Sequence, residues 1–357
     1  MNESLPLPSP GHIVLFGSGE TSPSGGKILQ ALAPRFASPL RVSVLETPAG
    51  FELNSAQVAG RVAEFMRVRL QNYQPTVEVI PARKRDTAYS PDDPALAARL
   101  LEAGVIFLGP GSPTYAARQL RDSLVWHTTR ARHRLGATLV LASAATLAIS
   151  AHVLPVYEIY KVGEDPHWRD GLNLLDDFGL PLIFIPHWNN TDGGADLDTS
   201  HCFIGAERFE NLIAQSPADI TIVGLDEHTA LILDFENGQG EVKGVGGVTL
   251  CQPQGERRFA ADETFPLSEL GPFRLPPPRA HIPPTIWEQV TAPPPARADE
   301  APSPEVLALV EARQAARARK DWPAADAARQ QLAAAGWEVQ DTPTGPNLRR
   351  LTPPQPA

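Results

Sequence analysis

The chain has 357 residues, a formal net charge of −10, 37 prolines and two cysteines. The acidic balance excludes a protein that binds nucleic acid over its whole surface, because neutralising phosphates takes clustered Lys and Arg. Two cysteines are too few for a disulfide framework or a zinc knuckle, and a single core organises roughly 250–300 residues, so we expect one large domain with a small appendage.

The first apolar run, residues 12–16, is too short for a signal segment or a membrane span. We therefore expect a soluble, cytoplasmic protein with no membrane contact. From residue 11 to about 250, short apolar runs alternate with segments that have helical spacing. The runs lie at residues 12–16, 41–46, 76–80, 105–109, 137–141 and 182–186.

Most of these runs are unbroken, as in strands that are buried on both faces. The segments 55–70, 94–103 and 113–132 carry apolar residues three and four positions apart, which predicts helices. The pattern indicates an α/β fold with a mostly parallel sheet flanked by helices. From residue 220 onward, tight runs with short Asp- and Gly-containing turns predict a terminal antiparallel addition.

Prolines collect between residues 271 and 304, which predicts an extended linker without a helix or a paired strand. After it, Ser303 and Pro304 are a typical helix start. A second helix is expected to end at Gly336, and a small hairpin to follow it. We thus divide the chain into a domain over 11–270, a linker over 271–304 and a small α+β module over 305–351.

Ser143 is the candidate nucleophile, because a buried strand leads directly into a helix at this residue. Such a junction presents a serine hydroxyl above the edge of the sheet. The helix N-terminus also offers backbone N–H groups to a developing oxyanion. The competing interpretation is that Ser143 only caps the helix.

His187 directly follows the buried run 182–186 and is the candidate base. Open α/β sheets bind their ligands at the edge where parallel strands end. The polar residues after His187 are placed to contact substrate, with capping of the loop as the alternative. They are Asn189, Asn190 and Thr191.

An acid is needed to orient the histidine. Glu158 lies between Ser143 and His187 in the chain. Glu164 and Asp165 compete with it for this role, and spacing alone does not decide among the three.

Several motifs in the first 250 residues resemble the cyanophycinase and dipeptidase E family of serine peptidases. They are Ser143-Ala144, the turn Gly109–Tyr115, the strand end Ile185–His187, the segment Gly224–Leu233 and the closing Gly244–Leu250. The resemblance implies the class I glutamine amidotransferase-like fold, in which helices flank a flavodoxin-like sheet. It also implies a serine-type exopeptidase or cyanophycinase-like hydrolase that acts on a small peptide or isopeptide, with no cofactor and no metal.

By the same resemblance, Ser143, His187 and Glu158 form the triad, and the backbone of Gly111 and Ala144 binds the oxyanion. The family elbow reads Gly-x-Ser-Ala-Gly, whereas Leu141 and Ala145 replace its glycines here. Because glycine permits the tight turn of an elbow, the alternative is a catalytically silent scaffold that works by binding.

The segment Glu305–Leu351 resembles the C-terminal piece of bacterial cysteinyl-tRNA synthetases. The likeness rests on residues 310–317, 320–329 and 336–345. In the synthetase this piece belongs to the anticodon-binding end, so the resemblance implies weak tRNA contact through residues 305–351. The signatures of aminoacylation are absent, which argues against a ligase.

The segment carries seven basic and six acidic residues. Binding to tRNA therefore requires that its basic residues cluster on one helix face, which their spacing permits. These residues are Arg313, Arg317, Arg319 and Lys320. A docking element for another partner is the alternative.

Overall fold

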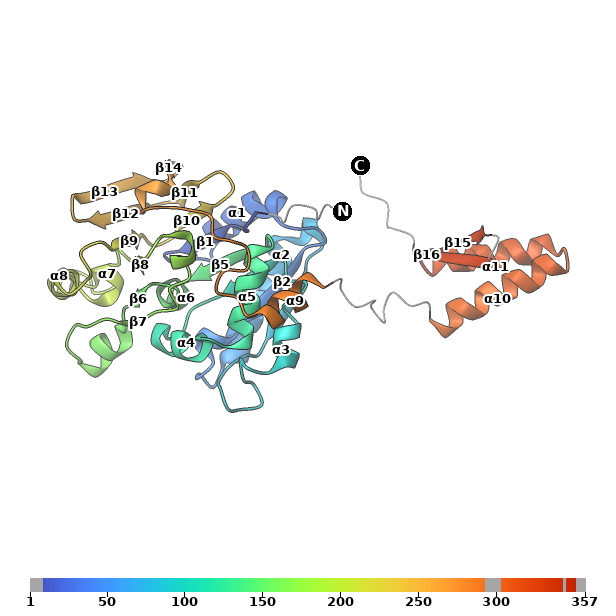
Figure 1. Ribbon diagram of the computed structural model, residues 1–357, viewed down its shortest axis with the longest axis horizontal. Helices are drawn as coiled ribbons and strands as arrows, with labels where there is room; N and C mark the ends of the chain where they lie inside the picture. The colour runs from blue at the N-terminus through green and yellow to red at the C-terminus, as the bar shows by residue number, and fades with distance from the viewer. Residues whose placement is uncertain (1–8, 293–302, 343–344, 351–357) are drawn as a thin grey trace. The chain divides into compact units, whose positions relative to one another are not determined.

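The computed structural model describes residues 9–292, 303–342 and 345–350. The chain forms two units, one that ends at Ala292 and one that follows it (Figure 1). Within the described ranges, no helix has the length and apolar character needed to cross a membrane.

The central sheet of the first unit has eight strands in the order β14-β11-β10-β1-β5-β4-β2-β3. The strands from β1 to β3 in this order are all parallel, which confirms the expected mostly parallel α/β sheet. They are β1 (Ile13–Phe16), β5 (Thr138–Ala142), β4 (Val105–Leu108), β2 (Arg41–Leu45) and β3 (Thr76–Ile80). The sheet continues on the other side of β1 with antiparallel strands, β10 (Thr229–Asp234), β11 (Gln239–Gly244) and β14 (Thr264–Pro266).

Helices cover both faces of this sheet, because its strands are apolar on both sides. Along β1, Ile13 and Leu15 belong to one buried cluster and Val14 and Phe16 to the other. The second of these clusters packs under α1 (Pro23–Leu32) and α2 (Ser55–Arg69). The first lies under α3 (Pro94–Ala98), α4 (Pro113–Leu120) and α5 (Leu124–Arg134).

A second sheet of four strands has the order β13-β12-β9-β8. Its strands are β8 (Leu182–Ile185), β9 (Thr221–Leu225), β12 (Gly247–Gln252) and β13 (Gly255–Ala260). The apolar run at 182–186 is thus a strand, but of this second sheet. The runs after residue 220 do not form one addition either, because β9 pairs in parallel with β8 whereas β10 joins the central sheet.

Two short helices, α7 (Ser200–Phe203) and α8 (Ala206–Ala214), lie beside the second sheet, and Phe209 and Leu212 pack on Ile183 and Ile222. The remaining pair of strands, β6 (His152–Val153) with β7 (Arg169–Asp170), is antiparallel.

The Pro-rich segment 271–304 is not an extended linker throughout, and this prediction is wrong for its central part. Pro284 begins helix α9 (Pro284–Thr291), whose Trp287 and Val290 pack against Ala131 of α5. A proline at the first helical position costs no backbone hydrogen bond, so this proline starts a helix instead of preventing one. The first unit therefore extends to Ala292, and residues 293–302 lie outside the described residues.

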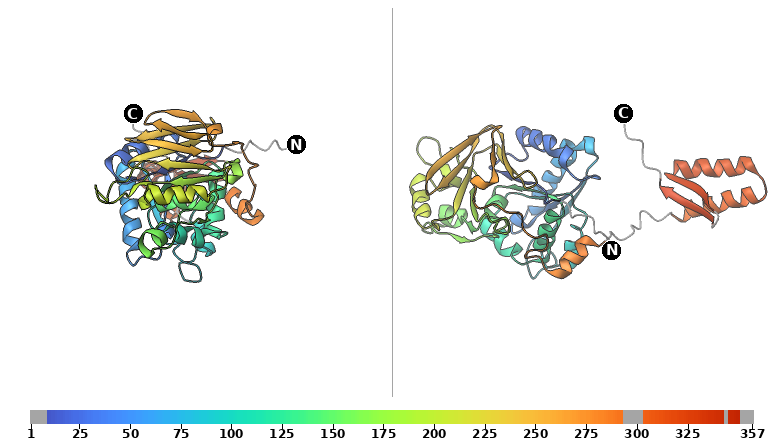
Figure 2. Two further views of the ribbon diagram at one scale, coloured as in Figure 1. Left: turned by 90° about the vertical axis from the view of Figure 1, so that its left-hand side faces the viewer. Right: turned by 45° about the horizontal axis from the view of Figure 1, so that its top comes forward.

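The second unit consists of α10 (Pro304–Ala318), α11 (Trp322–Ala334), β15 (Trp337–Thr342) and β16 (Gly345–Arg350). Ser303 caps α10 by accepting a hydrogen bond from the backbone N–H of Val306, and the two strands form an antiparallel hairpin. Val310, Leu332 and Trp337 share its small core. The expected pair of helices followed by a hairpin is confirmed (Figure 2), although Leu351, where we expected the module to end, lies outside the described residues.

Candidate active site

Ser143 lies at a strained turn between β5 and helix α6 (Ala144–Ala148). Its φ of 52° and ψ of −112° are unusual for a residue with a side chain, and this strain is typical of a nucleophile elbow. Among the described residues, its hydroxyl makes no capping hydrogen bond to α6. The interpretation of Ser143 as a plain helix cap is therefore wrong.

The elbow forms although it lacks both glycines of the family pattern. Leu141 is fully buried and belongs to the main core cluster, and Ala145 is buried beside it. Thr146 stabilises the turn, since its hydroxyl donates to the backbone oxygens of Leu141, at 3.1 Å, and Phe16, at 3.2 Å. The substitutions are thus compatible with the elbow backbone.

Three polar side chains form a continuous chain at this edge of the molecule. Ser143 Oγ lies 3.1 Å from His187 Nε2, and His187 Nδ1 lies 3.1 Å from Glu227 Oε1. Each residue follows the end of a strand, namely β5, β8 and β9. Such an arrangement suits a serine nucleophile, a general base and an acid that orients the base.

A cavity of about 340 Å³ opens beside Ser143 and His187. Tyr157, Tyr160 and Phe203 give it aromatic walls. Lys161 is the one Lys, Arg, Asp or Glu among the described residues that line it. The cavity can hold a group about the size of one or two amino-acid residues, and its cation favours an acidic group.

Gly111 and Ala144, the two residues that the family resemblance suggests as oxyanion donors, also line this cavity. Gly111 has a φ of 149°, and a Cβ there would lie 1.9 Å from the backbone oxygen of Pro48. Only glycine fits this close approach of two backbones. The next residue secures the turn, because the N–H of Ser112 donates to the same oxygen at 2.9 Å.

Comparison with solved structures finds a peptidase of similar fold. A peptidase from an acI-B1 Actinobacterium aligns with 72% of this chain and 97% of its own, with a TM-score of 0.58 and 20% sequence identity. The aligned part of the chain has a peptidase-like fold. A putative peptidase E from Listeria monocytogenes EGD-e aligns with 67% of this chain and 100% of its own, at a TM-score of 0.42 and 16% identity.

The C-terminal segment matches a different kind of protein. Residues 299–347 match the family model of the cysteinyl-tRNA ligase anticodon binding domain. A cysteine–tRNA ligase from Rubrobacter xylanophilus is 49% identical over 53 residues, which are 15% of this chain and 11% of that ligase. The chain therefore spans only a small part of that relative. The expected combination of a peptidase-like part with a segment similar to the synthetase is confirmed.

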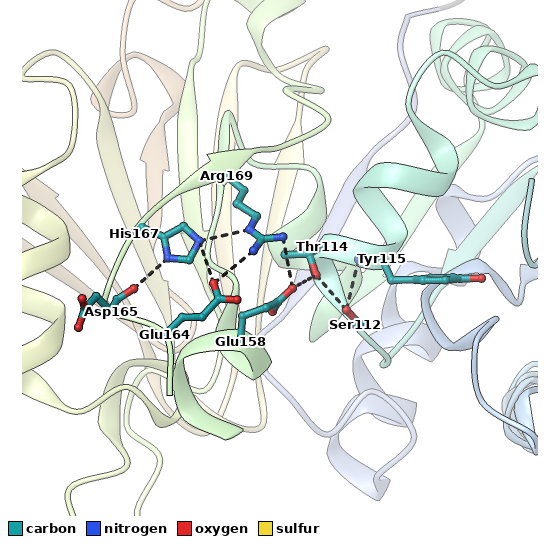
Figure 3. A network of polar contacts seen from close by, with 8 residues as sticks. All are labelled: Ser112, Thr114, Tyr115, Glu158, Glu164, Asp165, His167 and Arg169. Carbon is teal, nitrogen blue, oxygen red and sulfur yellow. Dashed lines mark hydrogen bonds and ion pairs between the residues drawn. The ribbon is translucent and has the colours of Figure 1, made fainter. Parts of the chain in front are cut away.

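Glu158 does not lie beside His187, contrary to the expectation from chain order. Its Oε1 accepts a hydrogen bond from Thr114 Oγ1 at 2.7 Å and lies 3.8 Å from Arg169 Nη1 (Figure 3). Glu158 begins a single helical turn, Glu158–Val162, that carries Tyr160 and Lys161 along the cavity wall. Its carboxylate thus joins this wall to α4 and β7.

The two competing acids are also placed elsewhere. Glu164 lies 3.3 Å from Arg169, and the backbone oxygen of Asp165 faces His167 Nδ1 at 2.9 Å (Figure 3). In the structure as described, neither contacts His187. The acidic side chain that contacts His187 is Glu227.

Glu227 lies inside the segment Gly224–Leu233, which carries part of the family resemblance, but it was not among the acids predicted from the sequence. The signal was present, because Glu227 comes two residues after the apolar strand β9. Parallel neighbours end at the same edge, and β9 is the parallel neighbour of β8, which ends just before His187. Assigning β9 to an antiparallel addition concealed this relation.

The residues after His187 are placed differently from the expectation of substrate contact. Asn190 is 2% exposed, and its Nδ2 donates to Glu227 Oε1 at 3.0 Å. Asn189 Oδ1 accepts the backbone N–H of Glu227 at 2.8 Å. Thr191 is exposed, and none of the three is among the described residues that line the cavity.

Cys202 is the one cysteine among the described residues that line the cavity. Burial raises the pKa of its thiol to about 12, so the thiol stays protonated and poorly nucleophilic at neutral pH. Its backbone N–H donates to the backbone oxygen of His187 at 3.1 Å. Cys202 therefore supports the base, and Ser143 is the better nucleophile candidate.

Proposed function

We propose that the protein is a serine-type hydrolase that cleaves a small peptide or isopeptide through an acyl-enzyme. The observation that carries the proposal is the unbroken contact from Ser143 Oγ through both ring nitrogens of His187 to Glu227. A peptidase-like fold supports the same class of reaction. The triad proposed here is Ser143, His187 and Glu227.

In the first step, His187 Nε2 takes the proton of Ser143 while Oγ attacks the substrate carbonyl. In this proposal the backbone N–H groups of Gly111 and Ala144, two residues of the cavity wall, donate to the oxyanion that develops. Glu227 accepts the N–H of His187 Nδ1 and stabilises the imidazolium. His187 then gives its proton to the leaving amine, and a water activated by His187 hydrolyses the acyl-enzyme.

The cavity supports a substrate with a small acidic part. Its volume of about 340 Å³ is at the low end of small-molecule sites, so it suits one or two residues rather than a folded chain. Lys161 in its wall supplies a charge that complements a carboxylate. An aspartyl peptide or isopeptide meets both conditions.

The proposal predicts that a fluorophosphonate modifies Ser143 in the native protein. Peptide mass mapping is expected to find the adduct on Ser143, because His187 activates its hydroxyl. The adduct should be absent in Ser143→Ala, and labelling of His187→Ala should fall below detection. Heat-denatured protein is the control for nonspecific reaction. An unmodified Ser143 in protein with a native circular dichroism spectrum contradicts the proposal and favours a silent scaffold.

A second function, contact with tRNA, is supported by the match of residues 299–347 to an anticodon binding domain. At the turn between α10 and α11, the side chain of Trp322 is 56% exposed. The guanidinium of Arg317 lies 5.9 Å from the centre of its ring, and Arg319 and Lys320 are adjacent in the chain. An exposed aromatic ring with basic neighbours is a stacking platform for an unpaired base.

This second proposal predicts a salt-dependent mobility shift of tRNA by the full chain. Trp322→Ala should weaken binding about 5- to 150-fold, since stacking contributes roughly 1–3 kcal/mol per base. Leu307→Ala is the matched control, because Leu307 is a similarly exposed apolar residue of α10, at 48%. A shift that persists when residues 303–357 are deleted rules out this role for the second unit.

A further inference from the structure

We infer that Asn190 is a positioning residue that holds the acid of the triad, an inference that rests on the proposed hydrolase function. The loop that follows β8 carries both His187 and Asn190, and it lies against the loop that follows β9 and carries Glu227. One loop therefore supplies the base and also fixes the acid that orients it.

The contact involves the same carboxylate oxygen that faces the histidine. Glu227 Oε1 lies 3.1 Å from His187 Nδ1 and accepts a hydrogen bond from Asn190 Nδ2 at 3.0 Å. Two donors converge on one oxygen, and this defines the rotation of the carboxylate. Glu227 needs such a restraint, because its side chain is 28% exposed and has other rotamers within reach of solvent.

The orientation of the Asn190 amide follows from its second contact. Asn190 Oδ1 accepts the backbone N–H of Asp192 at 3.1 Å, so Nδ2 is the end that faces Glu227. The side chain is 2% exposed, and its backbone N–H donates to the oxygen of His187 at 3.2 Å. Contacts other than the one to Glu227 therefore hold both the backbone and the side-chain oxygen of Asn190 in place.

The two loops are joined by further contacts along their length. The backbone N–H of Trp188 donates to the oxygen of Leu225 at 3.0 Å, and Asn189 Oδ1 accepts the N–H of Glu227 at 2.8 Å. These contacts hold the Glu227 backbone, whereas Asn190 is the one described residue besides His187 that hydrogen-bonds to its carboxylate. Removing the Asn190 amide therefore frees the acid while the loops remain paired.

The test is the saturation kinetics of Ser143 modification by a fluorophosphonate. Asn190→Ala is expected to lower the limiting rate about 10- to 100-fold, the usual weight of a hydrogen bond to a charged group, and to leave the half-saturating concentration unchanged. Asn237→Ala is the matched control. Asn237 Nδ2 also donates to a carboxylate, that of Asp234 at 2.8 Å, but the pair is exposed on a different turn. The control should keep the wild-type rate.

A double-mutant cycle separates positioning from a general structural role. In the Glu227→Ala background, Asn190→Ala should change the rate less than two-fold, since Asn190 acts through the acid. An equal loss in both backgrounds, or no loss in the wild-type background, overturns the inference. Asn190→Asp retains the acceptor for Asp192 while placing a like charge beside Glu227, and it should lower the rate at least as much as alanine. If the wild-type protein itself does not react with the fluorophosphonate, the result contradicts the proposed hydrolase function and not the role of Asn190.

Discussion

Glu227→Ala is expected to lower the rate of Ser143 modification about 10⁴-fold, the scale on which loss of a triad carboxylate acts. Without Glu227, nothing that we describe accepts the N–H of His187 Nδ1, so the imidazole loses its tautomer and its orientation. Glu158→Ala should leave the rate within about ten-fold, because Glu158 contacts Thr114 and Arg169 in the cavity wall rather than the histidine. Fluorophosphonate kinetics on the two variants side by side measure the difference.

Glu164→Ala is the control for removing an acid near the same wall, since Glu164 also pairs with Arg169. It should behave like Glu158→Ala. The opposite result, in which Glu158→Ala abolishes labelling and Glu227→Ala is tolerated, would mean that the reactive state rearranges to the acid suggested by chain order. Glu227 would then lose its place in the proposed triad.

Ser143 and His187 could be found from the sequence because their signals are local. Each directly follows an apolar run that is long enough for a strand, and the ends of such runs meet at the functional edge of an α/β sheet. Glu227 has the same local signal after β9. Its relevance, however, depends on β9 lying parallel to β8, and hydrophobic periodicity does not specify which strands pair.

The proline content before the second unit predicts an extended linker, yet part of this segment is helical, for a related reason. Prolines at 276–278 and 283–284 exclude regular structure only where a backbone N–H is required. At the first helical position none is required, and Ile286, Trp287 and Val290 then bury an apolar face against α5. Three apolar residues at helical spacing thus outweighed the prolines that precede them.

A buried carboxylate, Asp177, also holds the residues before α9 against the rest of the first unit, and its side chain is 4% exposed. Its Oδ2 lies 2.5 Å from a guanidinium nitrogen of both Arg130 and Arg134, and its Oδ1 lies 2.6 Å from His281 Nδ1. Asp177→Ala leaves Arg134, itself 3% exposed, without this partner. Breaking a buried pair in this way costs about 3–5 kcal/mol of unfolding free energy, which urea unfolding of the first unit will measure.

His281→Ala is the matched control and should cost less than about 1 kcal/mol of unfolding free energy, because His281 is 72% exposed and its loss leaves no buried charge unpaired.

The effect of Asp177 on stability also has a defined pH dependence. Burial alone would raise the pKa of Asp177, but the hydrogen bond from His281 and the charges of Arg130 and Arg134 outweigh it and hold the pKa below its ordinary 3.8. A carboxylate with a lowered pKa stabilises the fold above its ordinary value and loses this effect as the pH falls through the lowered one. The gap between wild type and Asp177→Ala should therefore be full at neutral pH and shrink below pH 3.8; a gap that does not change with pH would show that Asp177 acts through packing and not through its charge.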